Sequence, residues 1–209
     1  MRRFVALIRR QSRGSTVAVF AVFWGAAYMA TNHFPLREPA ALPFLPFEED
    51  IPFMGWTVLV YFSAFVQGLW VAWLLDREAL ARGTAAAYGM VVVHVLIFAT
   101  FPTTYPRPVA PPLTSQLIRG LYHSLCFADS PGNCFPSLHV SMAALFSLAL
   151  WRCRPRPGRI FLGWSFLIIL STLTTKQHYA LDAFGGLAIA FAAYCLAFGK
   201  RSASSAPQR

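Results

Sequence analysis

Two residues near the C-terminal end of the chain combine the chemistry of an acid and a base. His178 and Asp182 lie four residues apart, between two long apolar runs. On a helix this spacing places both side chains on one face. A carboxylate that accepts a hydrogen bond from one imidazole nitrogen leaves the other nitrogen free and more basic. The pair therefore predicts a base or a nucleophile, although a lone histidine beside an apolar run is more often a packed structural residue.

A second histidine follows a helix-start pattern earlier in the chain. The stretch Phe135-Pro136-Ser137-Leu138-His139 places Pro and Ser at the beginning of an apolar run, which by itself indicates only where a helix starts. If the chain crosses a membrane six times, this start and the start of the last run lie on the same face. His139, His178 and Arg107 would then share one membrane depth. We expect these groups to form one site.

The composition indicates that most of the chain lies in a membrane. Hydrophobic residues make up 56% of the 209 residues and charged residues only 12%, whereas soluble domains carry about 25% charged residues. Apolar runs near the length that crosses a bilayer indicate an all-α polytopic membrane protein with one domain over residues 14–199. The fourth and fifth runs are at the short end of the spanning range. The six predicted transmembrane helices are residues 14–33, 52–75, 84–101, 135–151, 160–175 and 179–199.

The net charge of +10 is distributed unevenly along the chain. Fourteen of the 18 basic residues fall on one side of the six-helix arrangement, and six of the eight acidic residues fall on the other. The positive-inside rule then predicts cytoplasmic termini and an extracytoplasmic histidine site. This distribution explains the charge without a nucleic-acid partner, and we expect none. Residues 1–13 would form a basic segment on the inner membrane surface, and residues 200–209 a disordered cytoplasmic tail.

The predicted outer loops carry further patterns. A leucine recurs every fourth residue between the third and fourth runs, which predicts a short interfacial helix: Leu113, Leu117, Leu121 and Leu125. Arg119 lies on another face of that helix. Cys126 and Cys134 flank the loop that follows and, on an oxidising side, allow a disulfide. The acidic stretch Glu48-Glu49-Asp50 before the second run is expected to be a solvated cap.

In order and spacing, these residues resemble the type 2 phosphatidic acid phosphatase (PAP2) superfamily. That family carries three motifs, K-x6-R-P, then P-S-G-H, then S-R-x5-H-x3-D. The resemblance covers roughly residues 50–199 and depends on the three motifs together, because any one alone is weak. The matching positions are Arg107-Pro108, Pro136-Ser137-x-His139, and Ser171, His178 and Asp182.

The chain departs from the family pattern at three positions. Thr100 stands in place of the first-motif Lys, Leu138 in place of the Gly, and Thr172 in place of the third-motif Arg. Two phosphate-binding cations are therefore missing, and Lys176 and Arg119 are the candidates to replace them. The F-P-S-L-H and H-Y-x-x-D forms are similar to the branch that contains inositol-phosphorylceramide and sphingomyelin synthases, which are phosphotransferases.

The resemblance implies a lipid phosphatase that forms a phosphohistidine. His178 would attack the phosphorus, Asp182 would orient it, and His139 would protonate the departing lipid alcohol. Four further residues would bind the phosphate oxygens: Arg107, Lys176, Ser137 and Arg119. Neither a metal nor a cofactor is expected, because no set of His, Cys and carboxylate residues has the spacing of zinc ligands. The expected partners are a lipid phosphate substrate and membrane lipids; the sequence indicates no oligomeric state.

Other interpretations of the sequence stay open. A phosphotransferase would move a phosphoryl or phosphoalcohol headgroup to a lipid hydroxyl instead of water. A haem-binding carrier would need a second mid-membrane histidine facing His94, which lies deep in the third run and is more often a residue that hydrogen-bonds a neighbouring helix. A transporter would carry polar residues at the midplane or an internal repeat. An inactive member of the family is a further alternative.

Overall fold

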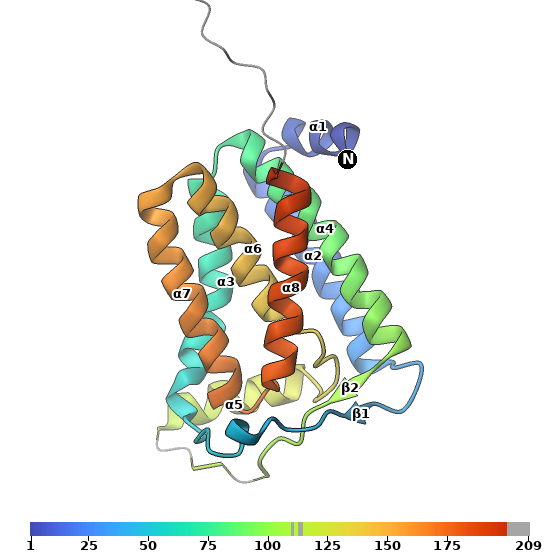
Figure 1. The fold of residues 1–209 in the computed structure, drawn as a ribbon, viewed down its shortest axis with the longest axis vertical. Coiled ribbons are helices and arrows are strands. Elements are labelled where there is room, and N and C mark those ends of the chain that lie inside the picture. The colour runs from blue at the N-terminus through green and yellow to red at the C-terminus, as the bar shows by residue number, and fades with distance from the viewer. Residues whose placement is uncertain (110, 113–114, 200–209) are drawn as a thin grey trace, which may run out of the picture.

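The computed structural model describes residues 1–109, 111–112 and 115–199 of the chain. Within these residues the chain folds into long helices that run alongside one another, with shorter helices at the two ends (Figure 1). The helices are α1 (Arg2–Arg10), α2 (Arg13–His33), α3 (Val58–Leu74), α4 (Arg77–Thr100), α5 (Gln116–Ala128), α6 (Leu138–Cys153), α7 (Pro155–Thr174) and α8 (Ala180–Phe198). The remaining elements are the 3-10 turns η1 (Pro46–Glu48) and η2 (Gly55–Thr57) and the short strands β1 (Ala40–Ala41) and β2 (Thr103–Thr104).

Among the described residues, five helices are long and apolar enough to cross a membrane: α2, α3 together with η2, α4, α7 and α8. The sixth predicted helix, α6, is apolar but has only 16 residues. At about 1.5 Å per residue it is shorter than a hydrocarbon core of about 30 Å. It packs against α3, α4, α7 and α8, and most of its side chains are buried. The all-α prediction is confirmed, and the six-helix arrangement holds with one internal helix that is short.

Polar residues define where the helices begin. Ser12 Oγ accepts the backbone N–H of Ser15 at 3.0 Å at the start of α2, and Asp76 Oδ1 accepts that of Ala79 at 2.8 Å at the start of α4. Such caps satisfy N–H groups that have no partner within the helix. Only Leu75 and Asp76 connect α3 to α4, so these two consecutive helices run in opposite directions.

The basic N-terminal segment contains α1, which lies at the same end of the bundle as the C-terminal end of α8 (Figure 1). Ile8 is buried against Ala81 and Ala85 of α4. The arginines of α1 are exposed, and Arg9 pairs with Glu78 of α4 at 3.2 Å. Residues 200–209, predicted to be a disordered tail, lie outside the described residues.

The helix α5, the turn η1 and the strand pair lie at the other end of the bundle (Figure 1). The predicted short helix is present as α5, where Tyr122 and Leu125 pack against Val58 and Tyr61. Leu113, the first leucine of the predicted repeat, lies outside the described residues. β1 pairs in parallel with β2. This pairing joins two loops at the end of the bundle where α6 and α8 begin.

Candidate active site

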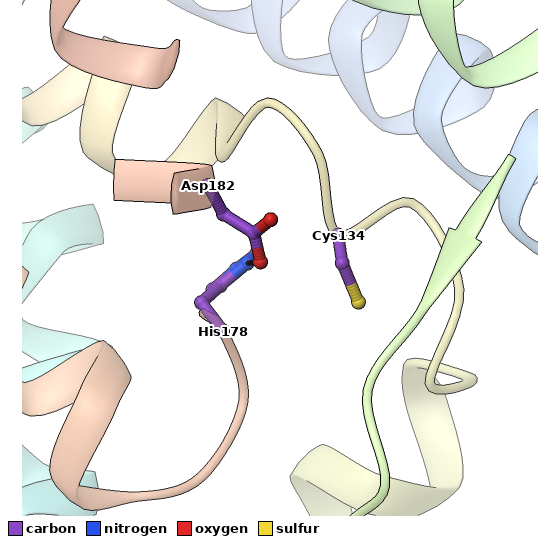
Figure 2. Close-up of side chains that lie close together, drawn as sticks. All are labelled: Cys134, His178 and Asp182. Atoms are coloured by element: carbon purple, nitrogen blue, oxygen red, sulfur yellow. Dashed lines mark hydrogen bonds and ion pairs between the residues drawn. The ribbon is translucent and has the colours of Figure 1, made fainter. Parts of the chain in front are cut away.

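His178 and Asp182 form a pair at the N-terminal end of α8 (Figure 2). His178 Nδ1 lies 3.1 Å from Asp182 Oδ2, and the two residues are 7% and 0% exposed. The helix begins only at Ala180, so His178 lies in the turn before it and not on a helix face. Asp182 reaches back as a capping residue, because its Oδ2 also accepts the backbone N–H of Tyr179 at 2.8 Å. The predicted pair is therefore present. It forms because Asp182 caps the start of α8, and not because the two side chains stack along one face of a helix.

A turn at the end of α7 determines the position of His178. Lys176 has a φ of 54°, and the N–H groups of Lys176 and Gln177 donate to carbonyl oxygens in the last turn of α7 at 3.1 and 3.0 Å. This is the Schellman arrangement, in which glycine usually holds the left-handed position. A lysine in this conformation costs about 1 kcal/mol relative to glycine. Its Nζ donates to the carbonyl oxygen of Glu48 at 3.4 Å, which ties this turn to η1.

Ser137, the first-turn cap of α6, lies directly against His178. Its Oγ is 3.3 Å from His178 Nε2, the ring nitrogen that Asp182 does not bind. Its backbone N–H donates to the carbonyl oxygen of Asp182 at 2.9 Å. Gly186 permits this approach, since a Cβ there would lie 2.5 Å from the carbonyl oxygen of Ser137. The starts of α6 and α8 are therefore in backbone contact.

His139 lies on the first turn of α6 and contacts α3. Its Nε2 donates to the carbonyl oxygen of Tyr61 at 3.0 Å, and its ring stacks on that of Tyr61 with centroids 4.0 Å apart. Because Nε2 carries the donated proton, Nδ1 is the nitrogen that can exchange one.

His139 and His178 line a single cavity of about 560 Å³. Residues of α2, α3, α5, the start of α6 and the turn before α8 enclose it. The walls are mainly aromatic and aliphatic, with Asp129 and Asn133 among the polar groups. Ser137 and Asp182 contact His178 from its sides. The fold thus brings both predicted histidines to one space, with an acid and a hydroxyl beside His178.

Arg107 is held next to this cavity by Asp129, a residue that the sequence did not single out. Arg107 Nη1 donates to the carbonyl oxygen of Asp129, and Nη2 lies 3.5 Å from its Oδ2. Tyr28 donates to the other carboxylate oxygen at 2.8 Å. Burial raises the pKa of Asp129 above its ordinary value, and the Arg107 charge offsets part of this effect. Arg107 Nε is buried with no hydrogen-bond partner among the described residues.

The other two predicted cations lie elsewhere. Lys176 contacts Glu48, and Arg119 is exposed on α5. Neither of them lines the cavity, and Arg107 adjoins it only through Asp129, which is a lining residue. Their role as phosphate ligands stays a prediction from the sequence.

Glu48 is a second residue that sequence reasoning missed. It is 3% exposed, and its carboxylate accepts the backbone N–H groups of Ala180 and Leu45, both at 2.6 Å. The expectation of a solvated acidic cap is wrong for Glu48, because η1 turns this side chain onto the start of α8; Glu49 and Asp50 are exposed. A carboxylate at a helix N-terminus is favourable. The pattern Leu45-Pro46-Phe47-Glu48, a turn start with an acid three residues on, is the signal that indicates it.

Cys134 lies beside the His178–Asp182 pair, in the loop before α6 (Figure 2). Cys126 and Cys134 are both free thiols, so the disulfide that the sequence allows does not form. The reason is that Cys134 is buried with its Sγ 3.3 Å from the carbonyl oxygen of Pro131, on the side of His178. The Cys134 Sγ, a His178 ring nitrogen and an Asp182 oxygen lie within 4.8 Å of one another. Sequence spacing did not indicate this donor set, because the fold joins residues that are far apart in sequence.

His94 is a structural residue that holds three helices together. It is fully buried, its Nδ1 donates to the carbonyl oxygen of Met90 at 2.8 Å, and its Nε2 accepts from Ser141 Oγ at 3.0 Å. Ser141 Oγ also lies 2.8 Å from the carbonyl oxygen of Gly186 in α8. The predicted hydrogen bond to a neighbouring helix is confirmed.

The sequence profile of the PAP2 superfamily matches residues 54–196, more than half of the chain. The matched stretch holds both histidines, Arg107, Ser137 and Asp182, and every cavity residue outside α2. No curated protein and no solved structure shows significant similarity to the chain.

Proposed function

The chain belongs to the PAP2 superfamily, and we propose that it is an integral membrane lipid phosphatase with His178 as its covalent nucleophile. One observation carries this proposal. His178 has its Nδ1 on Asp182 and its Nε2 toward Ser137, and it lines the same cavity as His139. Asp182 fixes the tautomer in which Nε2 carries no proton and can attack phosphorus.

The reaction has two steps that use groups of this chain. In the first, His178 Nε2 forms a bond to phosphorus, the bond from phosphorus to the lipid alcohol breaks, and His139 Nδ1 gives its proton to the leaving oxygen. In the second, water attacks the phosphorus of the phosphohistidine and gives a proton to His139, the N–P bond breaks, and phosphate leaves. General acid–base catalysis of this kind contributes about 10²–10⁴ in rate. Asp182 stabilises the imidazolium in both steps.

Arg107 and Ser137 are the proposed ligands of the phosphate oxygens. The Ser137 hydroxyl lies 3.3 Å from His178 Nε2, where a transferred phosphoryl group would be. Arg107 Nε is a buried donor without a partner among the described residues, and a phosphate oxygen would satisfy it. The Arg107 guanidinium is otherwise bonded to Asp129. Substrate must therefore compete with Asp129 for Arg107.

A lipid is the proposed substrate because an apolar cavity continues from the histidines between α2 and α3. This second cavity, of about 220 Å³, shares Trp24, Phe65 and His139 with the first. Its walls are almost entirely apolar side chains of α2, α3, α4 and α6. An acyl or isoprenoid chain would fill it while the phosphate reaches His178.

The test is turnover of a panel of lipid phosphates by purified protein, with released phosphate and transferred headgroup both measured. Replacing the nucleophile in His178→Ala should lower turnover by more than about 10³-fold without loss of folding. The matched control is His123→Ala, which removes an exposed histidine of α5 and should leave turnover unchanged. Retained turnover in His178→Ala would end the proposal.

Lipid phosphotransfer is the second candidate, and Leu138 favours it. This residue stands where the family motif has Gly, and it lines the cavity beside His139. An apolar side chain at that position suits a lipid acceptor better than water. In the same assay, a new phosphorylated lipid in place of free phosphate would identify this reaction.

The proposed orientation places the termini in the cytoplasm and the site on the extracytoplasmic face. Two observations support it. The arginines of α1 lie at one end of the bundle, and the helix starts that carry His139 and His178 lie at the other (Figure 1). Basic residues accumulate on the cytoplasmic side of membrane proteins.

A further inference from the structure

We propose that Cys134, His178 and Asp182 form an inhibitory binding site for a thiophilic divalent cation such as Zn²⁺, which takes the nucleophile out of the reaction. The ligand atoms of the three residues lie within 4.8 Å of one another, and all three side chains are buried (Figure 2). Thiolate, imidazole and carboxylate are the donors that zinc prefers in proteins. The inhibitory role rests on the proposed function; the binding itself does not.

An independent observation at Asp182 points to a missing ligand. Its Oδ2 accepts from both His178 Nδ1 and the Tyr179 N–H. Its Oδ1 is buried with no hydrogen-bond partner among the described residues. Leaving a charged oxygen buried without a partner is costly. A cation bound to this oxygen would remove that cost.

Cys134 distinguishes this site from the catalytic groups. The proposed phosphoryl transfer uses His178 and Asp182 but gives no role to the thiol. Three protein ligands would leave one position of a tetrahedral ion for water or a phosphate oxygen. While the ion is bound, neither His178 nor Asp182 can act in catalysis, so occupancy and turnover exclude each other.

The experiment uses Co²⁺ as the probe, on purified full-length protein stripped of metal by a chelator. Bound cobalt should give the near-ultraviolet absorption of a thiolate–cobalt bond, and Zn²⁺ should abolish it. The band should be present in the wild type and in the matched control Cys126→Ser. It should be lost in Cys134→Ser, which keeps a hydroxyl to donate to Pro131, and in Cys134→Ala. This readout needs no turnover, so it separates failure of this proposal from failure of the proposed phosphatase activity.

Zinc inhibition provides the second readout. The Zn²⁺ concentration that halves lipid phosphate turnover should be at least about tenfold higher in Cys134→Ser than in the wild type. Basal turnover should be the same in both proteins. No cobalt–thiolate band in the wild type, or an undiminished band in both Cys134 variants, would overturn the proposal.

Discussion

The guanidinium of Arg107 has two competing partners, the Asp129 carboxylate and the phosphate of the proposed substrate. The ion pair is largely buried, with side chains 13% and 16% exposed. In such surroundings a pair gains little over its desolvation cost, although removing one partner leaves an uncompensated charge. In the proposed function, Asp129 therefore holds the guanidinium that the phosphate would bind. Its replacement should separate the stability of the site from its affinity for phosphate.

Asp129→Asn should change stability little and strengthen phosphate binding. Any loss in unfolding free energy should lie well below the about 3–5 kcal/mol usual for a broken buried pair, because the raised pKa of Asp129 means that folding already favours its uncharged form, which asparagine resembles. Orthovanadate, a phosphate mimic, should raise the melting temperature of the variant more than that of the wild type, since Arg107 no longer has to leave a carboxylate. Thermal unfolding with and without vanadate measures both effects.

The control for this prediction is Asp50→Asn, which neutralises an exposed acid at the same end of the bundle. The raised pKa of Asp129 adds a pH dependence. Stability from this group is greatest at low pH and falls as pH rises through the raised pKa, since folding favours the protonated form. Asp129→Asn should lack that fall. An equal vanadate shift in variant and wild type would contradict the competition between Asp129 and phosphate.

At the scale of single residues, the sequence predicts the proposed reacting groups better than the groups that position them. His178, Asp182 and His139 are found from motif spacing because chemistry restricts their types. Motif spacing did not identify Asp129 and Glu48, since each acts on a residue far along the chain. The sequence left a disulfide open at Cys134 for the same reason: its neighbours across the fold are not visible in the sequence.

The helices are the elements that the sequence predicts most closely, because apolar runs of spanning length leave little choice of structure in a membrane. The boundaries of α2 differ from the predicted ones by one residue at most. The predicted second helix begins later, at η2, because the chain before it is irregular and the Met54 N–H donates to the carbonyl oxygen of Thr174 at 2.9 Å. The apolar runs could not predict how closely the helices approach one another. Small residues leave room for the two cavities between α2 and α3: Gly25 lines the larger one and Gly68 the smaller one.

Gly68→Leu should shorten the chain that the site accepts. Gly68 lines the inner cavity, and a Cβ there would meet no atom within 4 Å, so a leucine can enter without displacing the backbone. Excluding two methylenes at about 0.8 kcal/mol each should lower kcat/KM for a long-chain lipid phosphate by about tenfold. A short-chain substrate should be turned over as before. Kinetics on a chain-length series checks this.

Gly89→Leu is the matched control, since Gly89 lies exposed on α4 and also has open space around it. Both substitutions replace a helical glycine by a strong helix former, so their effects on helix stability should be alike. If Gly68→Leu and Gly89→Leu give the same chain-length profile, the cavity does not hold the lipid chain.

The whole molecule has two chemically different ends. One carries the exposed arginines of α1, and the other carries the histidines, Asp129 and Glu48. The sequence predicts this separation from the positions of the charged residues alone. Successive membrane helices run in opposite directions, so the segments that connect them lie alternately at the two membrane faces. The orientation that follows from it is a prediction of the positive-inside rule.

Cysteine labelling in intact cells tests this orientation. His123→Cys places a thiol on the exposed side of α5, and Cys153 is an exposed native thiol at the far end of α6. A membrane-impermeant maleimide should modify Cys126 or the cysteine at position 123 in intact cells. It should modify Cys153 only after the membrane has been permeabilised. Mass spectrometry of the labelled peptides assigns each site. The reverse order would place the histidines in the cytoplasm.

In the proposed function, the crevice between α2 and α3 also determines whether the substrate arrives from the membrane or from water. Its rim includes the exposed side chains Phe65 and Leu69, so it opens toward the acyl chains of the surrounding leaflet. A lipid can then arrive by lateral diffusion without leaving the bilayer. The velocity should follow the mole fraction of the phosphorylated lipid in the membrane plane, and diluting the bilayer with neutral phospholipid should slow the enzyme even when the amount of substrate per volume is constant.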